Sequence, residues 1–226
     1  MSFWGQLGFQ DSFSVLSFEL SFFHDHAMFV LVMVSSFVGY MMFCLLKSSL
    51  SSRFLMEAQA LEAAWTMVPG LLLLILAIPS VRLLYLLDEV GGPAVSLKAV
   101  GHQWYWEYEY SDGGRSVNFD SYMVGAGATA QGGYRLLTVD NRCVLPCGVD
   151  SRVLFTSADV ITAWALPSVE VKVDAIPGRI NQLGMHLMGS GVMFGQCSEI
   201  CGVNHSFMPI GVEGVSPGVF YSWLMN

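Results

Sequence analysis

The chain has 226 residues, of which 54% are hydrophobic and only 12% are charged. A soluble domain usually carries about a quarter charged residues, so this composition excludes an ordinary soluble protein and indicates membrane segments beside a water-soluble part. The formal net charge is −8, and because nucleic acids are bound through Lys and Arg, so acidic a chain is excluded as a nucleic-acid-binding protein.

Two long apolar runs come first, at about residues 22–46 and about residues 63–87. Each reaches the roughly 20 residues that a helix needs to cross a bilayer. Pro69 and Pro79 in the second run would kink a soluble helix, but neighbouring helices make them tolerable in a membrane. Residues 1–90 are therefore predicted to form a two-helix membrane anchor, and residues 91–226 a separate outer domain.

The connection between the two runs holds Lys47 and Arg53, whereas the N-terminal flank holds no basic residue. Positive loops stay on the inner side, so both termini and the outer domain are expected on the outer side. Arg82 near the outer end of the second run argues mildly against this, unless it snorkels or pairs with Asp88 or Glu89.

From residue 91 onward, short β-rich runs alternate with turn residues, which is typical of a β-sandwich or barrel. The predicted strands are 95–100, 103–110, 135–139, 151–157, 163–166, 169–173, 191–195 and 208–213. The whole chain is thus expected to be an α+β membrane protein, with a helical hairpin followed by a β domain.

Five cysteines, an odd number, exclude a fully paired disulfide framework within one chain. Cys44 lies in an apolar run, where a buried free thiol is the default. Cys143 and Cys147 lie in a segment that is interpreted as the end of a strand. If this segment is extended, the two Cα atoms are roughly 13 Å apart. A disulfide needs less than about 7 Å, so structural thiols are favoured.

The most informative stretch holds Cys197, Cys201, His205 and Met208, in a C-x3-C-x3-H-x2-M spacing. Thiolate and thioether are soft ligands, and together with imidazole they favour copper over hard cations. A second Cys on the same loop lets two thiolates bridge two copper ions. Zinc is less favoured because it would want Cys or His in the place of Met208. Plain structural thiols remain the third interpretation.

Two further features have both a purely structural and a functional interpretation. The run 101–110, read as a strand, puts His102, Trp104, Trp106, Tyr108 and Tyr110 on one face, and such an aromatic row is more often packing than an electron route. Glu62, at the inner start of the second run, can simply favour the positive helix N-terminus. An acid at the inner edge of a membrane protein is also a candidate for a proton pathway.

Several motifs in this order resemble cytochrome c oxidase subunit II. They are the pair of apolar runs, the run 101–110, Asp140-Asn141-Arg142, the run 174–179 and the 197–208 loop. The resemblance covers nearly the whole chain, and the loop and the His-Gln-Trp-Tyr-Trp run are highly specific.

The resemblance implies a cupredoxin-like β domain with a dinuclear copper centre, called copper A. By position, Cys197 and Cys201 would bridge the metals, and His205 and Met208 would bind one each. The backbone carbonyl of Glu199 would be a further copper ligand, and its carboxylate would contact a magnesium ion shared with subunit I.

The same resemblance assigns roles outside the loop. Trp104 matches the tryptophan at which electrons from cytochrome c enter, and Glu62 matches the acid at the mouth of a proton pathway. An acidic surface for cytochrome c would include or lie close to Glu109, Asp112, Asp120, Asp140 and Asp159.

One position departs from the family pattern. The family has Ser-x-Asp-Val-x-His-x-Trp where this chain has Thr162 in the place of the histidine, which is the second copper-binding imidazole. One copper ion would lose its nitrogen ligand, with His186, water or nothing in its place.

The sequence therefore predicts the subunit that passes electrons from cytochrome c to the haem–copper subunit I, for oxygen reduction coupled to proton pumping. It is expected in the mitochondrial inner membrane, or in a bacterial plasma membrane. The alternative is a structural subunit II with a degenerate, copper-poor site. A free-standing copper carrier is disfavoured because a carrier has no need of two membrane spans.

Overall fold

The computed structural model describes residues 4–54, 56–88, 90–111, 114–125 and 133–226, in two compact units. One unit comprises residues 19–85, and the other comprises residues 1–18 together with 86–226. The N-terminal segment thus belongs to the same unit as the β domain, although the two are far apart in sequence.

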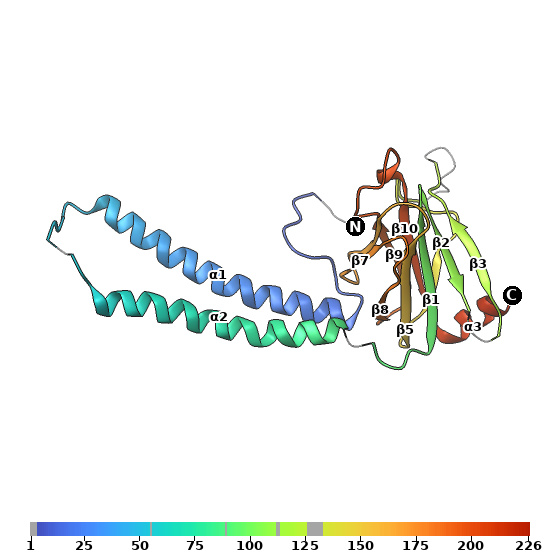
Figure 1. Cartoon of the computed structure of the whole chain (residues 1–226), viewed down its shortest axis with the longest axis horizontal. Coiled ribbons are helices and arrows are strands. Elements are labelled where there is room, and N and C mark those ends of the chain that lie inside the picture. Colours follow the sequence, from blue (N-terminus) through green and yellow to red (C-terminus); the bar gives the residue numbers. More distant parts are fainter. Residues whose placement is uncertain (1–3, 55, 89, 112–113, 126–132) are drawn as a thin grey trace. The chain divides into compact units, whose positions relative to one another are not determined.

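Two helices form the first unit, α1 (Val15–Lys47) and α2 (Gln59–Asp88), and they run antiparallel in Figure 1. Both are long and apolar enough to span a membrane, with a mean hydropathy of 2.3. Each begins before the apolar run that predicted it. Their large apolar side chains are mostly exposed, as is expected of a surface that faces lipid.

Arg82 forms an ion pair with Glu19, with 3.5 Å between its Nη2 and the carboxylate. Of the two acids expected as partners, Asp88 is therefore not the one that pairs with Arg82, and Glu89 lies outside the described residues. Both partners lie near the same end of the hairpin, so the charge on α2 is compensated from α1.

Within the described residues, ten strands and a short C-terminal helix build the β domain. The strands are β1 (Val95–His102), β2 (Tyr105–Tyr110), β3 (Val117–Ser121), β4 (Cys143–Pro146), β5 (Asp150–Ser157), β6 (Thr162–Leu166), β7 (Val171–Ala175), β8 (Asn181–His186), β9 (Gly191–Gln196) and β10 (Pro209–Val215). The helix is α3 (Pro217–Met225), and a 3-10 turn, His205–Phe207, lies before β10.

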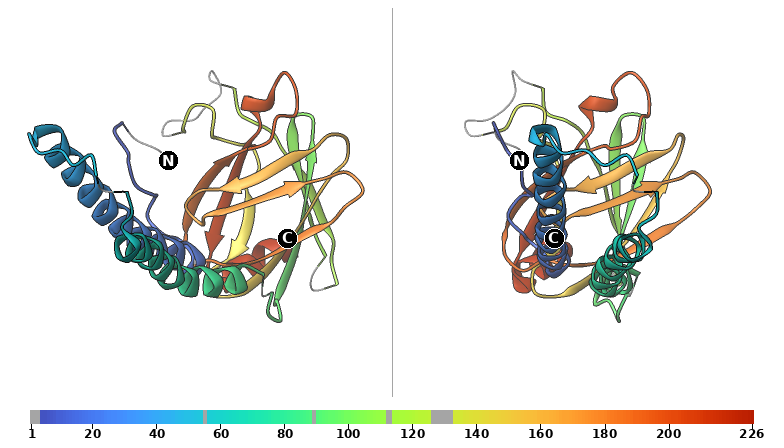
Figure 2. Two further views of the ribbon diagram at one scale, coloured as in Figure 1. Left: turned by 60° about the vertical axis from the view of Figure 1, so that its left-hand side comes forward. Right: turned by 90° about the vertical axis from the view of Figure 1, so that its left-hand side faces the viewer.

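The strands form three sheets, in the orders β3-β2-β1-β5-β8, β4-β10-β9 and β6-β7. In Figure 2 the green strands β1 to β3 lie on one side of the domain, and the red-brown strands β9 and β10 lie on the other. β1 pairs antiparallel with β2 and parallel with β5, so the sheet is mixed. The expectation of a β-sandwich or barrel is met.

Backbone hydrogen bonds connect the N-terminal segment to the β domain. Phe13 donates its N–H to Ser168 and accepts the N–H of Met188, at 2.9 and 3.0 Å. The Phe13 ring lies where a Cβ on Gly191 would come within 3.2 Å of it. This glycine therefore makes room for the ring.

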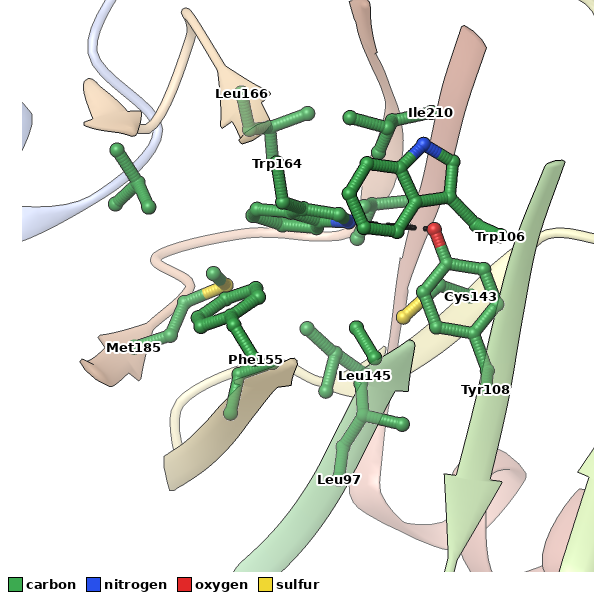
Figure 3. Close-up of a cluster of buried hydrophobic side chains, with 14 of the residues drawn as sticks. Leu97, Trp106, Tyr108, Cys143, Leu145, Phe155, Trp164, Leu166, Met185 and Ile210 are labelled. Atoms are coloured by element: carbon green, nitrogen blue, oxygen red, sulfur yellow. Dashed lines mark hydrogen bonds between the residues drawn. The ribbon is translucent and has the colours of Figure 1, made fainter. Parts of the chain in front are cut away.

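The core lies between the sheets and combines large aromatic side chains with aliphatic and sulfur-containing ones (Figure 3). Trp106, Tyr108 and Tyr110 share the buried face of β2. The indole of the buried Trp164 lies 3.3 Å from the Tyr108 hydroxyl, to which it donates a hydrogen bond. These three β2 side chains therefore pack in the core, as the structural interpretation of the aromatic row predicts.

Several predicted elements differ from the structure. Residues 135–139 form no strand, because residues 135–137 turn and only Val139 makes an isolated bridge, to Met123. Trp104 is not on the strand face that was expected, because residues 103–104 form the turn between β1 and β2. The strands β3 and β8 and the helix α3 were not anticipated from the sequence, whereas β4 lies where Cys143 and Cys147 were interpreted as a strand end.

Candidate metal centre

The candidate metal centre is the loop between β9 and β10, residues 197–208. The two strands pair antiparallel, with Gln196 opposite Pro209 at the last position before the loop. Cys197 and Met208 are the next residues outward, so the sheet register alone brings the two ends of the ligand motif together. Folding of the hairpin thus assembles part of the site before any metal binds.

Cys201 is the hub of the cluster. Its Sγ lies 4.0 Å from Cys197 Sγ, 3.6 Å from His205 Nδ1 and 3.4 Å from Met208 Sδ. The ligand atoms of the two cysteines and His205 all lie within 4.8 Å of one another. Both cysteines are free thiols, and their sulfur separation is about twice a disulfide bond of roughly 2.05 Å.

The sulfur-bearing side chains of the cluster are buried, and its histidine is less so. Cys197, Cys201 and Met208 are buried, with exposed fractions of 7, 4 and 1%, whereas His205 is half-buried. The backbone carbonyl of Glu199 lies 3.4 Å from Cys197 Sγ, so an oxygen also faces the cluster. Burial, together with the neighbouring Cys197 thiol, raises the pKa of the Cys201 thiol to about 12. A metal that binds this sulfur as thiolate must therefore displace a proton.

This donor set fits copper. Two thiols, an imidazole and a thioether are soft or borderline ligands. These groups and the Glu199 carbonyl each lie within 4.0 Å of a cysteine sulfur. Met208 argues against a structural zinc site, which closes with four Cys or His ligands. Of the alternatives left open by the spacing, copper fits the geometry best.

Thr162 lies beside this loop in β6. The carbonyl of the next residue, Ala163, accepts the N–H of Ser198 at 3.1 Å, which holds β6 against the segment between the two cysteines. Thr162 is fully buried, and its hydroxyl finds no hydrogen-bond partner among the described residues. A Cβ on Gly101 would come within 2.1 Å of that hydroxyl oxygen. Where the family pattern has an imidazole, this chain thus has a buried hydroxyl that lies against Gly101.

Neither of the other two histidines of the β domain joins the cluster. His186 Nδ1 is 2.8 Å from the Asp150 carboxylate, at the ends of the paired strands β5 and β8. His102 Nε2 is 2.9 Å from Glu107, and its ring stacks on Tyr105 with centroids 4.6 Å apart. Among the described residues, the metal-binding cluster holds His205 as its one histidine.

The turn between β1 and β2 touches the cluster from outside. Trp104 is half-buried, and its indole Nε1 donates to the Cys201 carbonyl at 3.3 Å. Gln103 also donates to this carbonyl, from Nε2 at 2.8 Å. Sequence reasoning missed Gln103; the available signal was its position beside Trp104 in a run already singled out.

The acids predicted for a docking surface differ in what holds them. Glu109 is ion-paired with Lys98 at 2.9 Å, and Asp140 accepts backbone N–H groups of Tyr122 and Asn141 at 2.8 and 2.7 Å. Asp159 is exposed, yet it accepts the N–H of Gln103 at 2.9 Å.

Asp120 is exposed on β3, and Asp112 lies outside the described residues. Of the predicted docking acids that the structure describes, Asp120 is thus the one whose carboxylate has no hydrogen bond or ion pair.

Two acids were assigned outside the docking surface. Glu62 is exposed in the first turn of α2, where its backbone carbonyl accepts the Thr66 hydroxyl at 2.9 Å. Glu199 is half-exposed between the two cysteines. The roles expected for these two acids stay predictions.

The chain is similar to known proteins along its whole length. Residues 95–215 match the family model described as cytochrome c oxidase subunit II, periplasmic domain, and residues 2–83 match the transmembrane domain of the same subunit. Cytochrome c oxidase subunit 2 of Drosophila algonquin and of Drosophila athabasca are each 53% identical over 226 residues, covering 100% of this chain and 98% of theirs.

A solved structure is similar as well. The periplasmic domain of subunit II of cytochrome oxidase from Bradyrhizobium japonicum is 44% identical, with a TM-score of 0.55, and covers 61% of this chain and 95% of that domain. The match confirms the cupredoxin-like fold of the β domain. The chain therefore belongs to the cytochrome c oxidase subunit II family, as a membrane-anchored subunit of a haem–copper terminal oxidase.

Proposed function

We propose that this subunit is where electrons enter the oxidase, from reduced cytochrome c, before they pass to subunit I for oxygen reduction coupled to proton pumping. The observation that carries the proposal is the hydrogen bond from the Trp104 indole to the Cys201 carbonyl, at 3.3 Å. It links a half-buried aromatic ring at the surface to the backbone of a buried sulfur donor. Trp104 is accordingly proposed as the side chain at which electrons arrive.

Copper would be held by the side chains of Cys197, Cys201, His205 and Met208 and by the carbonyl of Glu199, as a dinuclear copper A centre. When bound there, copper supplies a one-electron redox couple within a dry sulfur environment. The chain's own part is to exclude water, to hold the ligand atoms of Cys197, Cys201 and His205 within 4.8 Å of one another, and to release the Cys201 thiol proton as metal binds. The copper-poor alternative is disfavoured because both cysteines are retained and lie together.

The proposed docking surface for cytochrome c surrounds Trp104. An open depression of about 520 Å³ there is lined in part by Tyr105, Tyr122 and Phe207. The rings of Tyr105 and Tyr122 stack with centroids 4.5 Å apart, giving a flat apolar patch. Asp120, Asp140, Glu109 and Asp159, with Asp112, are proposed to ring it with negative charge, which would steer a basic partner toward the indole.

Two further roles are proposed on position. Glu62, exposed in the first turn of α2, is the proposed mouth of a proton pathway. The Glu199 carboxylate is proposed to contact a magnesium ion at the contact with subunit I, because its carbonyl already faces the sulfur cluster. A magnesium site there would lie directly beside the copper ligands.

The proposed topology places the connection 48–58 in the mitochondrial matrix and the β domain in the intermembrane space. It is supported by Lys47 and Arg53 at that connection. Protease added to sealed inner-membrane vesicles of known orientation tests it. Cleavage beyond residue 90 from the matrix side alone would contradict the proposal.

Copper stoichiometry and electron uptake together test the function. Trp104→Phe in the assembled oxidase should leave the copper content unchanged and slow electron uptake from cytochrome c by more than an order of magnitude. Trp223→Phe is the matched control, since this indole packs on Tyr110 and is not among the side chains that line the depression. Wild-type complex without copper, or equal rates in both variants, would refute the proposal.

A further inference from the structure

The Cys201 carbonyl is an unusually well-anchored backbone group. It accepts two hydrogen bonds from consecutive side chains, Gln103 Nε2 at 2.8 Å and Trp104 Nε1 at 3.3 Å. Both donors come from the turn between β1 and β2, about 100 residues earlier in the chain. A carbonyl has two lone pairs, so both acceptor sites of this one oxygen are occupied.

Gln103 is held from its other end as well. Its backbone N–H donates to Asp159 Oδ2 at 2.9 Å, while Asp159 Oδ1 accepts the N–H of Val160 at 2.6 Å. The carboxylate therefore bridges the β1–β2 turn and the turn before β6. A charge-assisted hydrogen bond of this kind is stronger than a neutral one, so Gln103 sits on a firm anchor.

The close approach depends on a glycine. Gly202 follows Cys201 with φ of +126°, a conformation that L side chains rarely adopt. A Cβ at this position would lie 3.2 Å from Gln103 Nε2 and 3.1 Å from the Trp104 ring. The absence of a side chain thus lets the ligand loop lie flat against the turn.

We propose that Gln103 is a positioning residue of the metal centre, which fastens the Cys201 carbonyl to the β1–β2 turn with Asp159 as its anchor. The inference rests on the proposed function and deepens it. Gln103 shares the carbonyl with Trp104 and is its neighbour, so it fixes the indole and the ligand loop relative to each other. Asp159 then contributes through its hydrogen bonds as well as through its surface charge.

Two consequences separate this role from general stability. Hydrogen bonds around ligand residues tune the properties of a metal, so loss of the Gln103 amide should move the reduction potential of bound copper. Without that donor, the segment around Cys201 should also open locally more often, even with no metal present. The second effect is independent of whether copper binds.

The experiment compares Gln103→Met with Gln182→Met in the full chain within the assembled oxidase. Methionine keeps the length of glutamine and removes the amide donor, and Gln182 is exposed on β8, away from the loop. After copper is removed by chelation, amide hydrogen exchange of residues 198–205 should be roughly tenfold faster in Gln103→Met and unchanged in Gln182→Met. In the copper-loaded complex, only Gln103→Met should shift the reduction potential.

Asp159 provides the second arm. Asp159→Ala removes both acceptor oxygens and should accelerate exchange of residues 198–205, whereas Asp159→Asn keeps one acceptor and should do so less. If Asp159 acts only through its charge, the two variants should weaken cytochrome c association equally and leave exchange unchanged.

The outcomes distinguish the two proposals. Exchange in Gln103→Met that matches Gln182→Met would overturn the positioning role, whatever the copper content. A second outcome is that exchange is faster in Gln103→Met than in Gln182→Met, while the wild-type complex is found to bind no copper. This outcome would leave the positioning role intact and refute the proposed electron-transfer function.

Discussion

The two sides of the metal centre obtain their chemistry in different ways. Among the described residues, the loop of residues 197–208 supplies every sulfur and nitrogen donor of the cluster, from one continuous stretch of sequence. The β6 side supplies Thr162, a buried hydroxyl without a hydrogen-bond partner among the described residues. One side is therefore complete as a set of soft ligands, and the other is not.

The difference shows how unequal the constraints on the two sides are. The β9–β10 register brings the loop donors together, and the side chains of Cys197, His205 and Met208 each contact the Cys201 sulfur. Thr162 is a core position that must first satisfy packing, since it is followed by Ala163 and the buried Trp164. A strand position of this kind tolerates a change of ligand chemistry as long as the side chain still fits.

Removal of the hub should have the largest effect on the centre. Cys201→Ser replaces a soft sulfur that contacts Cys197, His205 and Met208 by a hard oxygen, so copper content should fall below half of the wild-type value. Elemental analysis and the thiolate-to-copper absorption of the purified complex measure this loss.

Cys147→Ser is the matched control. Its thiol donates to the Gly189 carbonyl at 2.9 Å and lies outside the cluster, so copper content should stay at the wild-type value. Full copper in Cys201→Ser would show that the loop is not the ligand-bearing side.

Repair of the β6 side should have the next largest effect. Thr162→His supplies a second imidazole, and imidazole is a far better copper ligand than a hydroxyl. Copper affinity should rise roughly tenfold or more, judged against the 10–100-fold effects of metal-site partners. Competition with a chelator of known affinity gives the change.

The cost of this repair falls on packing. The side chain must fit where a Cβ on Gly101 would already meet the Thr162 hydroxyl, so the metal-free domain should lose about 1–3 kcal/mol of stability. Thr162→Val separates the two effects, because it removes the unpaired hydroxyl without adding a ligand. It should stabilise the metal-free domain by about 1 kcal/mol and leave copper affinity unchanged. Unaltered affinity in Thr162→His would mean that the β6 side does not reach the metal.

The same contrast explains what could be predicted from the sequence. The loop donors were identified from spacing alone, because a hairpin loop keeps sequence neighbours together. Thr162 was identified only through the family pattern, since nothing in its local sequence places it beside residues 35 positions later.

Long-range contacts were the main omission. Gln103 was missed because its role depends on a contact with Cys201, 98 positions away. Trp104 was placed on a strand face because the run 101–110 is uniformly β-prone, and only the β1–β2 pairing, with His102 opposite Tyr105, reveals the turn. Strands β3 and β8 were missed because short segments gain their strand pairing from neighbours that the local pattern does not show.

Surface charge should affect partner association and leave both sides of the centre unchanged. Asp120→Asn removes an exposed carboxylate on β3, so cytochrome c association should weaken roughly two- to fivefold at low salt. Exposed charges are screened beyond about 8–10 Å at ordinary ionic strength, so the difference from wild type should shrink as salt rises. Stopped-flow rates across a salt series measure it, and a salt-independent difference would argue against electrostatic docking.

The core behind the centre should matter least to copper. Cys143 in β4 is fully buried, and burial raises the pKa of its thiol to about 12, which keeps it protonated and unreactive at neutral pH. Its sulfur accepts a long hydrogen bond from the Tyr110 hydroxyl at 3.5 Å, within the aromatic core. Cys143→Ala should therefore lower stability by about 1–2 kcal/mol through the small cavity it leaves.

Copper content and the thiolate absorption should be unchanged in this variant, while the unfolding midpoint falls by a few degrees. Thermal unfolding followed beside copper analysis separates the two. Cys143 lies on β4, which pairs with β10, and it is directly opposite Val212. Val212 in turn is four residues along the chain from Met208. If its removal released copper, the ligand loop would depend on core packing as strongly as β6 does, and the contrast between the two sides would disappear.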